Sequence, residues 1–426
     1  MASRASVAHM ATGPAGLPCL RAQVGRVLED FLRGQRRVLA AISPDLLPWL
    51  DAIEQLVAGG KRLRPAFCYW GWRAAGGADC PEIITAASAL ELLHASALVH
   101  DDVMDASETR RGQRAVHRRF AARHEVAGWR GSADTFGMSA AILIGDVLQA
   151  WTDELLHGSG LPAAALLHGR PVLDAMRTEV IAGQYLDLLS QAAGDGTVGS
   201  ALRVVRYKSA KYTIERPLHL GVALASAAPA CAAPACAAPA DPAAGAAAPA
   251  GPAAGGTAAE GPAAERPAAE RAAAEAAAAD RPAASPVGTG QAIAAACTGY
   301  GIPLGIAFQL RDDVLGVFGD PAQTGKPISD DIREGKRTVL MAMARRRATP
   351  AQAEVLDRLL GNPLVDRAGV AQVRTVIVET GALRECEMMI GSNVSSALSA
   401  LDGAPIATAA KDALADLAVA ATARRD

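Results

Sequence analysis

The sequence predicts an all-α protein that folds as a single large helical bundle. Apolar residues recur at helical spacing through most of the chain. No strand pattern or hairpin signal competes with that spacing. Half of the 426 residues are apolar, which is enough for a large core. Because aromatic residues make up only 4% of the chain, this core is expected to consist mainly of Ala, Leu, Val and Ile.

The expected helices follow one another with short breaks. In the N-terminal half, the apolar spacing predicts helices over residues 20–42, 45–58, 64–76, 82–105, 136–157, 172–191 and 204–225. Gly59 and Gly60 separate the second from the third, and Pro65 suits the first turn of the third. Pro217 is expected to kink the last one. In the C-terminal half, the same spacing predicts helices over residues 292–320, 338–347, 351–361, 366–380, 383–402 and 407–424.

A low-complexity segment divides the chain. Over residues 226–287 the composition falls to Ala, Pro and Gly. Frequent prolines forbid a long helix there, and almost nothing large is available to bury, so we expect a disordered insertion between two helices. A long surface insertion costs little closure entropy. Residues 20–225 and 288–426 are then expected to form one domain together, behind a flexible N-terminus over residues 1–19.

Composition excludes several classes of protein. The formal charge of −2 provides no basic field, so nucleic-acid binding has no electrostatic support. The seven cysteines are odd in number, scattered and without a CxxC pair, which suits a reducing cytoplasm. The N-terminus lacks the apolar core of a signal peptide. No uninterrupted apolar run approaches the roughly 20 residues of a membrane span. We therefore expect a cytoplasmic protein without a transmembrane segment.

Three aspartates stand at the end of an apolar helix, in the stretch LVHDDVMDASETRRG. Asp101 and Asp105 are one turn apart and share a face, and Asp102 can reach the same rim. Charges this close repel by about 4 kcal/mol per pair at an effective dielectric near 20. Mg²⁺ offsets such repulsion and commonly shares its ligand shell between carboxylates and a phosphate-bearing substrate. A helix cap is the alternative, but these acids lie at the C-terminal end, where the helix dipole disfavours them.

A second acidic pair lies near the other end of the chain. In FQLRDDVLGVFGD, Asp312 and Asp313 again follow a long apolar helix. In a helical bundle, two such helices can face each other across a central cavity. The two clusters are therefore predicted to be facing metal ligands.

Basic residues accompany both clusters. They occur in GGKRLRP from Gly59 to Pro65, at Arg110 and Arg111, at Lys208 and Lys211 in YKSAKYT, and at Lys326 and Lys336 in GKPISDDIREGKRT. Each alone is typical of a solvated surface charge. Beside two carboxylate clusters they indicate a site for two diphosphate groups, since Arg binds phosphate as a bidentate fork and Lys as a point charge.

The motifs GGKRLRP, ELLHASALVHDDVMDASETRRG, GQYLDL, YKSAKYT and FQLRDD with GKPISDDIREGKRT occur in this order. This series resembles the trans-prenyl diphosphate synthases, and most closely the bacterial geranylgeranyl diphosphate synthases. The similarity runs from about residue 25 to the end, without the insertion. It implies a helical bundle of the isoprenoid synthase type around a central cavity. It also implies a homodimer whose substrates are isopentenyl diphosphate and an allylic diphosphate (dimethylallyl, geranyl or farnesyl).

The resemblance implies a role for each matching residue. Asp101 and Asp105, with Asp102 in support, and Asp312 with Asp313 resemble the Mg²⁺ ligands, for which three ions per site and Mn²⁺ as a substitute are expected. The residues that resemble isopentenyl diphosphate contacts are Lys61, Arg64, His94 and Arg111. Those that resemble groups holding the allylic diphosphate are Arg110, Lys208, Ser209, Gln309, Lys326 and Lys336. Without the resemblance, His94 would be read as a core histidine.

Two positions depart from the family pattern. Gly316 stands where many relatives have the third aspartate of the second cluster, so this cluster keeps two acids and its metal affinity is in question. Ser209 stands where threonine is usual, and the hydroxyl is retained.

The implied reaction needs no protein nucleophile, and the sequence offers no convincing Ser/His/Asp or Cys/His arrangement. Mg²⁺ and cationic side chains stabilise the leaving diphosphate, so the allylic C–O bond ionises to a carbocation. The alkene of isopentenyl diphosphate attacks this cation, and a proton leaves to the departing diphosphate. Apolar helices below the acids exclude the water that would quench the cation.

Product length is predicted from the residues below Asp101. Ala97 and Ser96, about one turn before it, are both small, whereas shorter-chain relatives typically carry an aromatic ring at this level. The chain can then extend at least to Leu93, roughly 12 Å below Asp101 by helix rise. This favours a product longer than farnesyl, most simply geranylgeranyl diphosphate, and predicts that Ser96→Phe shortens it.

Other functions remain open. A farnesyl or a longer-chain synthase would use the same motifs. A terpene cyclase shares the fold and one acidic helix, but it would not need GGKRLRP, and no metal motif of the N/D-D-x-x-S/T-x-x-x-E type occurs. A non-catalytic subunit of a heteromeric synthase usually lacks acids in one cluster, and Gly316 is the one hint of this.

Overall fold

A computed structural model describes residues 16–194, 196–226, 290–319 and 330–422. In its N-terminal part the elements are α1 (Leu17–Ile42), the 3₁₀ turn η1 (Pro44–Leu46), α2 (Leu47–Val57), α3 (Leu63–Ala74), α4 (Pro81–Met104), β1 (Thr109–Arg110), β2 (Gln113–Arg114), α5 (Val116–Ala127), α6 (Ala133–His157), α7 (Ala163–Ala193), α8 (Val198–Val204), the wide helix η2 (Val205–Glu215) and α9 (Arg216–Ala225). The C-terminal part contains α11 (Gly290–Phe318), α13 (Asp330–Arg333), α14 (Val339–Arg347), α15 (Pro350–Leu359), α16 (Arg367–Glu379), α17 (Ala382–Asp402) and α18 (Thr408–Thr422). The predicted all-α fold class is thereby confirmed.

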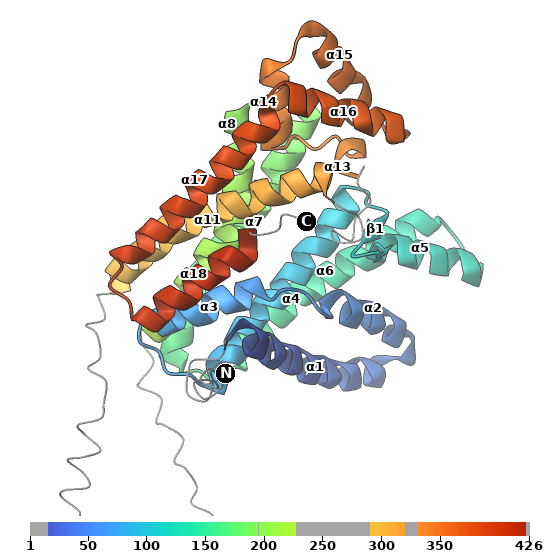
Figure 1. Cartoon of the computed structure of the whole chain (residues 1–426). Coiled ribbons are helices and arrows are strands. Elements are labelled where there is room, and N and C mark those ends of the chain that lie inside the picture. The colour runs from blue at the N-terminus through green and yellow to red at the C-terminus, as the bar shows by residue number, and fades with distance from the viewer. Residues whose placement is uncertain (1–15, 195, 227–289, 320–329, 423–426) are drawn as a thin grey trace, which may run out of the picture.

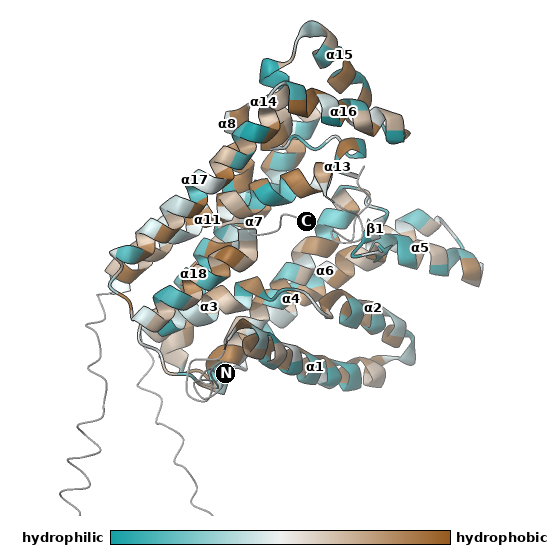
Figure 2. Ribbon diagram, viewed as in Figure 1, coloured by the Kyte–Doolittle hydropathy of each residue, from teal (hydrophilic) through white to brown (hydrophobic). Residues whose placement is uncertain are grey.

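The long helices α4, α6, α7 and α11 form the middle of the molecule. Helices α1 and α2 lie at one end and α14 to α16 at the other (Figure 1). The most extensive helix pairs are α4 with α6, α11 with α17, and α3 with α9. Apolar and polar residues are interspersed along these helices, as amphipathic packing requires (Figure 2).

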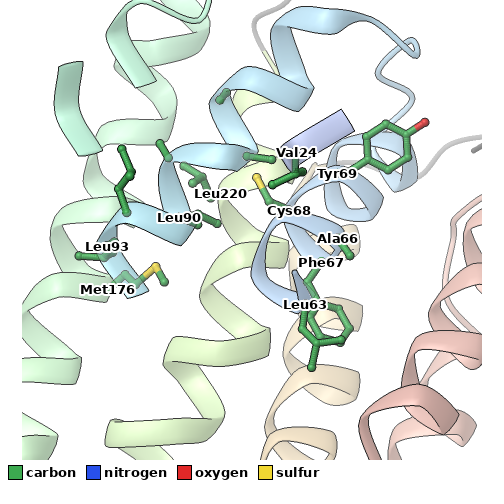
Figure 3. Packing of buried hydrophobic residues seen from close by; sticks show 14 of the residues in the cluster. Val24, Leu63, Ala66, Phe67, Cys68, Tyr69, Leu90, Leu93, Met176 and Leu220 are labelled. Atoms are coloured by element: carbon green, nitrogen blue, oxygen red, sulfur yellow. The ribbon is translucent and has the colours of Figure 1, made fainter. Parts of the chain in front are cut away.

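Two groups of buried apolar residues form the core. The larger group joins α1 to α4 with α6, α7, α9 and the start of α11, and residues such as Val24, Phe67, Leu90 and Leu220 meet in it (Figure 3). The second group joins the end of α11 to α8, α14, α16 and α17. Helix α11 takes part in both, with Leu304 in the first and Leu310 in the second. The end of α11, where the second acidic pair lies, is therefore held firmly between the two groups.

Helices α3 and α9 pack backbone to backbone through two glycines. A Cβ on Gly71 would overlap the carbonyl oxygen of Leu218, and one on Gly221 would overlap that of Cys68. Only glycine permits this approach, because any side chain at either position would force the helices apart.

Residues 205–215 form a wide helix with π-type hydrogen bonding between α7 and α11. Glycines of the neighbouring helices allow its close packing. A Cβ on Gly183 would lie 2.5 Å from the backbone nitrogen of Lys208, and one on Gly301 would lie 2.9 Å from the Cα of Glu215. The wider turn changes the phase of the side chains, a feature that is common at functional sites.

The sequence interpretation was wrong at several places, and it also missed α8 and the first turns of α7. The hairpin of β1 and β2 pairs Thr109 with Arg114, although no hairpin was expected. Helix α5 was missed, since its sequence VHRRFAARHEVA is strongly charged. Pro217 stands at the start of α9, where proline is tolerated, and the irregularity lies before it in the wide helix. The predicted insertion over 226–287 lies almost entirely outside the described residues, so the domain boundaries stay a prediction.

Two helices, α4 and α11, are long and apolar enough to cross a membrane if only length and composition are considered. The sequence analysis predicted a protein without a transmembrane segment. In the structure, 72% of the apolar stretch of α4 is buried inside the protein, as in the core helix of a globular fold. The two helices are therefore weak indications of a membrane span.

The α3–α9 contact predicts the effect of one added methyl group. Gly221→Ala is expected to destabilise the protein by about 1–3 kcal/mol, because the core there has no space. Gly34→Ala, in the middle of α1 with nothing near its added Cβ, is the control and is expected to stabilise by about 0.5–1 kcal/mol. Urea unfolding of both variants measures this. Equal stabilities would contradict the close approach.

Candidate active site

Most of the predicted site residues line one large cavity. Its volume is about 1360 Å³, and its walls come from α4, α6, α7, η2 and α11, with further residues from 331 to 338. Charged residues from both acidic clusters belong to its lining. Apolar residues line it as well, among them Leu93, Val180, Ile181, Leu188 and Phe308.

The three aspartates of α4 have different surroundings. Asp101 lines the cavity and accepts a hydrogen bond from Lys208 Nζ at 3.1 Å. Asp105, the C-cap residue of α4, is nearly covered, and its Oδ2 lies 3.4 Å from Lys336 Nζ. Asp102 is fully buried and accepts from Arg110 Nε at 2.8 Å. Only Asp101 of the three belongs to the cavity lining, so Asp102 and Asp105 both differ from the predicted arrangement, in which all three acids share a rim.

The second acidic pair faces the same cavity from α11. Asp312 and Asp313 both line it. Gln309 Nε2 donates to Asp313 Oδ1 at 2.8 Å, and Ser209 Oγ donates to Gln309 Oε1 at 2.6 Å. The hydroxyl retained at position 209 thus orients Gln309, which in turn orients Asp313.

Two lysines neutralise the clusters. Lys208 Nζ lies between Asp101 and Asp187, at 2.7 Å from the Oδ2 of the latter. Lys336 Nζ lies 2.9 Å from Glu334 Oε2 and 3.6 Å from Asp331 Oδ1, besides its contact with Asp105. Lys336 therefore connects the first cluster with the segment that follows the second one.

The carboxyl groups at the site have widely different pKa values. Burial alone would raise the pKa of Asp101, but Lys208, Lys336 and Arg110 outweigh it and lower that pKa to about 2. Burial, reinforced by the charge of Asp101, raises the pKa of Asp105 to about 6. Burial raises the pKa of Asp313 to about 7, with Asp331 and Asp312 adding to it against the hydrogen bond from Gln309. Neighbouring acids with divergent pKa values are typical of functional sites.

The donors present suit a hard divalent cation. Among the described residues no group of three or more His, Cys, Asp or Glu side chains is already assembled as a metal site. Asp105 Oδ2 and Asp313 Oδ2 are nevertheless buried without a hydrogen-bond partner. Carboxylate oxygens of Asp101, Asp312 and Asp313 line the same cavity. An all-oxygen donor set of this kind fits Mg²⁺ rather than zinc or copper.

Basic residues line the cavity as well, namely Lys61, Arg64, His94 and Arg111. Arg64 Nη2 donates to Thr213 Oγ1 at 2.8 Å, and its guanidinium lies 4.3 Å from the ring centroid of Tyr212. Arg111 donates to the carbonyl oxygens of Leu56 and Ala58.

Burial, together with the charges of Arg64 and Arg111, lowers the pKa of His94 well below its ordinary value. At neutral pH His94 is therefore uncharged, and its unpartnered Nδ1 is available to a ligand. The surrounding arginines and lysine supply the positive charge that an anionic group needs.

A buried ion pair supports this basic region. Arg62 has a left-handed backbone with φ of 55°, and it is not part of the cavity lining. It donates to Glu91 Oε2 at 2.6 Å and to the carbonyl oxygen of Val57 at 2.8 Å, and both charged residues are less than 8% exposed. The pair anchors the loop that carries Lys61 and Arg64.

The structure corrects one prediction about the cavity wall. Ala97 and Leu93 line the cavity, but Ser96 does not and is fully buried. At about 100° per residue, Ala97 is close in phase to Asp101, four residues on, whereas Ser96 is about 140° away. The predicted effect of Ser96→Phe on product length is therefore withdrawn. Lys326 lies outside the described residues.

Several residues at the site were missed by the sequence interpretation: Arg62, Glu91, Asp187, Tyr212, Thr213, Asp331 and Glu334. Asp187 belongs to the recognised motif GQYLDL, and Asp331 and Glu334 to GKPISDDIREGKRT, so their motifs were a usable signal. Glu91 and Thr213 act through partners 29 and 149 residues away in the chain, and nothing local indicates such pairs.

An all-α fold, two acidic helix ends at one cavity and the cations beside them define the class of trans-prenyltransferases. The model of the polyprenyl synthetase family matches residues 48–238 and 269–377, well over half of the chain. The chain therefore belongs to the polyprenyl synthetase family.

Relatives of known name agree with this assignment. The geranylfarnesyl diphosphate synthase of Aeropyrum pernix is 28% identical over 381 residues, which cover 88% of this chain and 93% of the relative. The geranylgeranyl diphosphate synthase of Mycobacterium tuberculosis is 26% identical and covers 92% of this chain and 89% of the relative. A crystal structure of geranylgeranyl pyrophosphate synthase from Corynebacterium glutamicum, complexed with isoprenyl diphosphate and magnesium, has 34% identity and a TM-score of 0.79 over 96% of this chain and 100% of that one.

The ion pair of Arg62 and Glu91 predicts a pattern of stabilities. Arg62→Met leaves the buried Glu91 carboxylate without its cation and is expected to cost about 3–5 kcal/mol. The double variant Arg62→Met/Glu91→Met is expected to recover most of this loss, because apolar residues then replace the whole pair. Urea unfolding at pH 7 measures both. A double variant no more stable than the single one would refute the pairing.

The raised pKa values of Asp105 and Asp313 predict that the metal-free protein loses stability as the pH rises. The folded chain holds these protons up to about pH 6 and 7, whereas in the unfolded chain the carboxyls titrate near 4. The stabilisation is therefore complete below about pH 4 and is lost as the pH passes 6 to 7. Thermal unfolding of chelator-treated protein between pH 5 and 8 should show this decline. Asp313→Asn should flatten it, and an unchanged slope would count against the assignment.

Proposed function

We propose that this protein condenses isopentenyl diphosphate head-to-tail with allylic diphosphates and releases geranylgeranyl diphosphate. The observation that carries the proposal is the lining of the cavity. Carboxylates and cations such as Asp101, Asp312 and Lys208 line it together with apolar side chains such as Leu93, Val180 and Phe308. A diphosphate with its metal ions needs the first kind of partner, and a growing hydrocarbon chain needs the second.

Mg²⁺ is the proposed cofactor, with three ions per site and Mn²⁺ as a substitute. Asp101, Asp105, Asp312 and Asp313 would hold it. When bound, Mg²⁺ neutralises the diphosphate and promotes its departure. The likeness to a prenyl synthase structure complexed with magnesium supports this choice.

The protein's own residues have complementary tasks in the proposed reaction. Lys208, Lys336 and Arg110 supply positive charge where the allylic diphosphate leaves, and Ser209 and Gln309 orient the adjacent acids. Lys61, Arg64, His94 and Arg111 hold isopentenyl diphosphate beside the first substrate. His94, being neutral, donates a hydrogen bond without competing for the proton that is released.

The cavity walls protect the intermediate and limit the product. Leu93, Val180 and Phe308 present no water to the allylic cation. Ala97 leaves the passage beside α4 open as far as Leu93. An open passage at this level supports a product longer than farnesyl diphosphate.

A turnover experiment tests the proposed function. The purified chain is incubated alone with labelled isopentenyl diphosphate, Mg²⁺ and dimethylallyl, geranyl or farnesyl diphosphate in turn. A twenty-carbon product from each primer is expected, and chelation of Mg²⁺ should abolish it. A fifteen-carbon or a longer product would replace the proposed chain length. If the chain forms no product alone, the non-catalytic subunit becomes the better interpretation.

Ala97→Phe is expected to shift the main product from twenty to fifteen carbons, because an aromatic ring would close the passage one turn below Asp101. Ser96→Ala, one residue away but outside the cavity, is the matched control and should leave the product unchanged. Chromatography of the dephosphorylated products measures chain length. A twenty-carbon product from Ala97→Phe would show that this side of α4 does not limit the chain.

We further propose that the protein is a homodimer, as the resemblance implies. Apolar side chains exposed on α6 and α7 support this: Phe136, Ile142, Leu143, Ile181, Tyr185 and Leu189. Light scattering would test it, and a monomer at micromolar concentration would contradict it. The cytoplasmic location stays a prediction that cell fractionation can check.

A further inference from the structure

The second acidic cluster has an unusual neighbour at Gly316. This residue lies one turn after Asp312 on α11, on the same helix face. A Cβ added to Gly316 would lie 2.9 Å from Asp331 Cγ and would overlap Asp331 Oδ2. The carboxylate of Asp331, contributed by α13, therefore fills the volume that a side chain at position 316 would need.

This carboxylate also faces the catalytic cavity. Asp312, Asp313, Gly316 and Asp331 all belong to its lining. Asp313 is only 6% exposed, and its Oδ2 is buried without a hydrogen-bond partner. An unpartnered, buried carboxylate oxygen beside further acids requires a compensating group, and a cation is the group that satisfies several such oxygens together.

We infer that Asp331 supplies, from α13, the third carboxylate of the second cation site, which α11 itself lacks because position 316 is glycine. The site then consists of Asp312 and Asp313 from one helix and Asp331 from another. This inference rests on the proposed function, because the cation is the one proposed for that reaction. It also explains how the second cluster can bind a cation although α11 itself supplies only two acids.

Position 316 and Asp331 compete for the same volume. A side chain at 316 would need the space that the Asp331 carboxylate now occupies, so this carboxylate would have to shift. Asp331 has a second neighbour in Lys336, whose Nζ is 3.6 Å from its Oδ1. The competing explanation is therefore that Asp331 only holds Lys336 in place.

Glu334 separates the two explanations. Its Oε2 lies 2.9 Å from Lys336 Nζ, closer than Asp331, yet Glu334 is not part of the cavity lining. Glu334→Gln weakens the support of Lys336 without removing a cation ligand. Asp331→Asn removes a ligand and keeps the size of the side chain.

The measurement is Mg²⁺ binding by calorimetry to the full chain saturated with inorganic pyrophosphate, so no turnover is required. Asp331→Asn removes one charged ligand and is expected to weaken Mg²⁺ binding by about 10-fold or more, and Glu334→Gln by less than about 3-fold. Similar losses in the two variants, or no loss in either, would overturn the inference. Prenyl transfer by the wild type is assayed separately, so that a chain that binds Mg²⁺ through Asp331 but makes no product refutes the proposed function alone.

A reciprocal exchange gives a second test. Gly316→Ala is expected to weaken Mg²⁺ binding, because its methyl group displaces the Asp331 carboxylate. Gly316→Asp/Asp331→Ser returns a carboxylate to the same volume from α11 and should restore affinity to within about 3-fold of the wild type. Gly316→Ala/Asp331→Ser relieves the overlap without a carboxylate and should stay weak. Circular dichroism confirms that each variant folds, and equal affinities of the two double variants would refute the inference.

Discussion

The site depends on negative charge that is partly buried around a cavity with many apolar lining residues. Carboxylates in such a place repel one another strongly and lose their hydration, so they persist only where cations face them. Lys208 meets this need for Asp101, and Lys336 meets it for Asp105 and Asp331. Both lysines are partly buried by the same packing that covers the acids. The acids therefore need the lysines, and the packing of the helices brings the two kinds of residue together.

The frame holds these charges through backbone contacts rather than through large side chains. The wide helix η2 fits between α7 and α11 because Gly183 and Gly301 leave space for it. Its changed phase brings Lys208 and Ser209 to the cavity together with Tyr212 and Thr213. Helix α11 is fixed in both groups of core residues, so its acidic end has little freedom. A bundle poor in aromatic residues achieves this rigidity by close helix approach.

The loop that carries the basic residues before α3 is held in place by buried contacts. The loop before α3 has left-handed residues at Gly59, Gly60 and Arg62, a conformation that side chains other than glycine rarely adopt. The buried pair of Arg62 with Glu91 stabilises this loop, while Arg64 stacks on Tyr212. Arg62 and Glu91 thus support the loop from outside the cavity lining, whereas Tyr212 lines the cavity beside Arg64. Such support keeps the binding side chains in the orientation that the reaction needs.

The sequence by itself determined the helices with strong apolar spacing, the two acidic clusters and the basic motifs, because these features depend on residues close together in the chain. Only the tertiary structure decided which acids face the cavity. It turned Asp102 toward Arg110 and Ser96 into the core, since helix phase and packing partners choose the face. It also brought Asp331 against Gly316 and Glu91 against Arg62. These contacts join different helices, and their distance in the chain hides them from any local pattern.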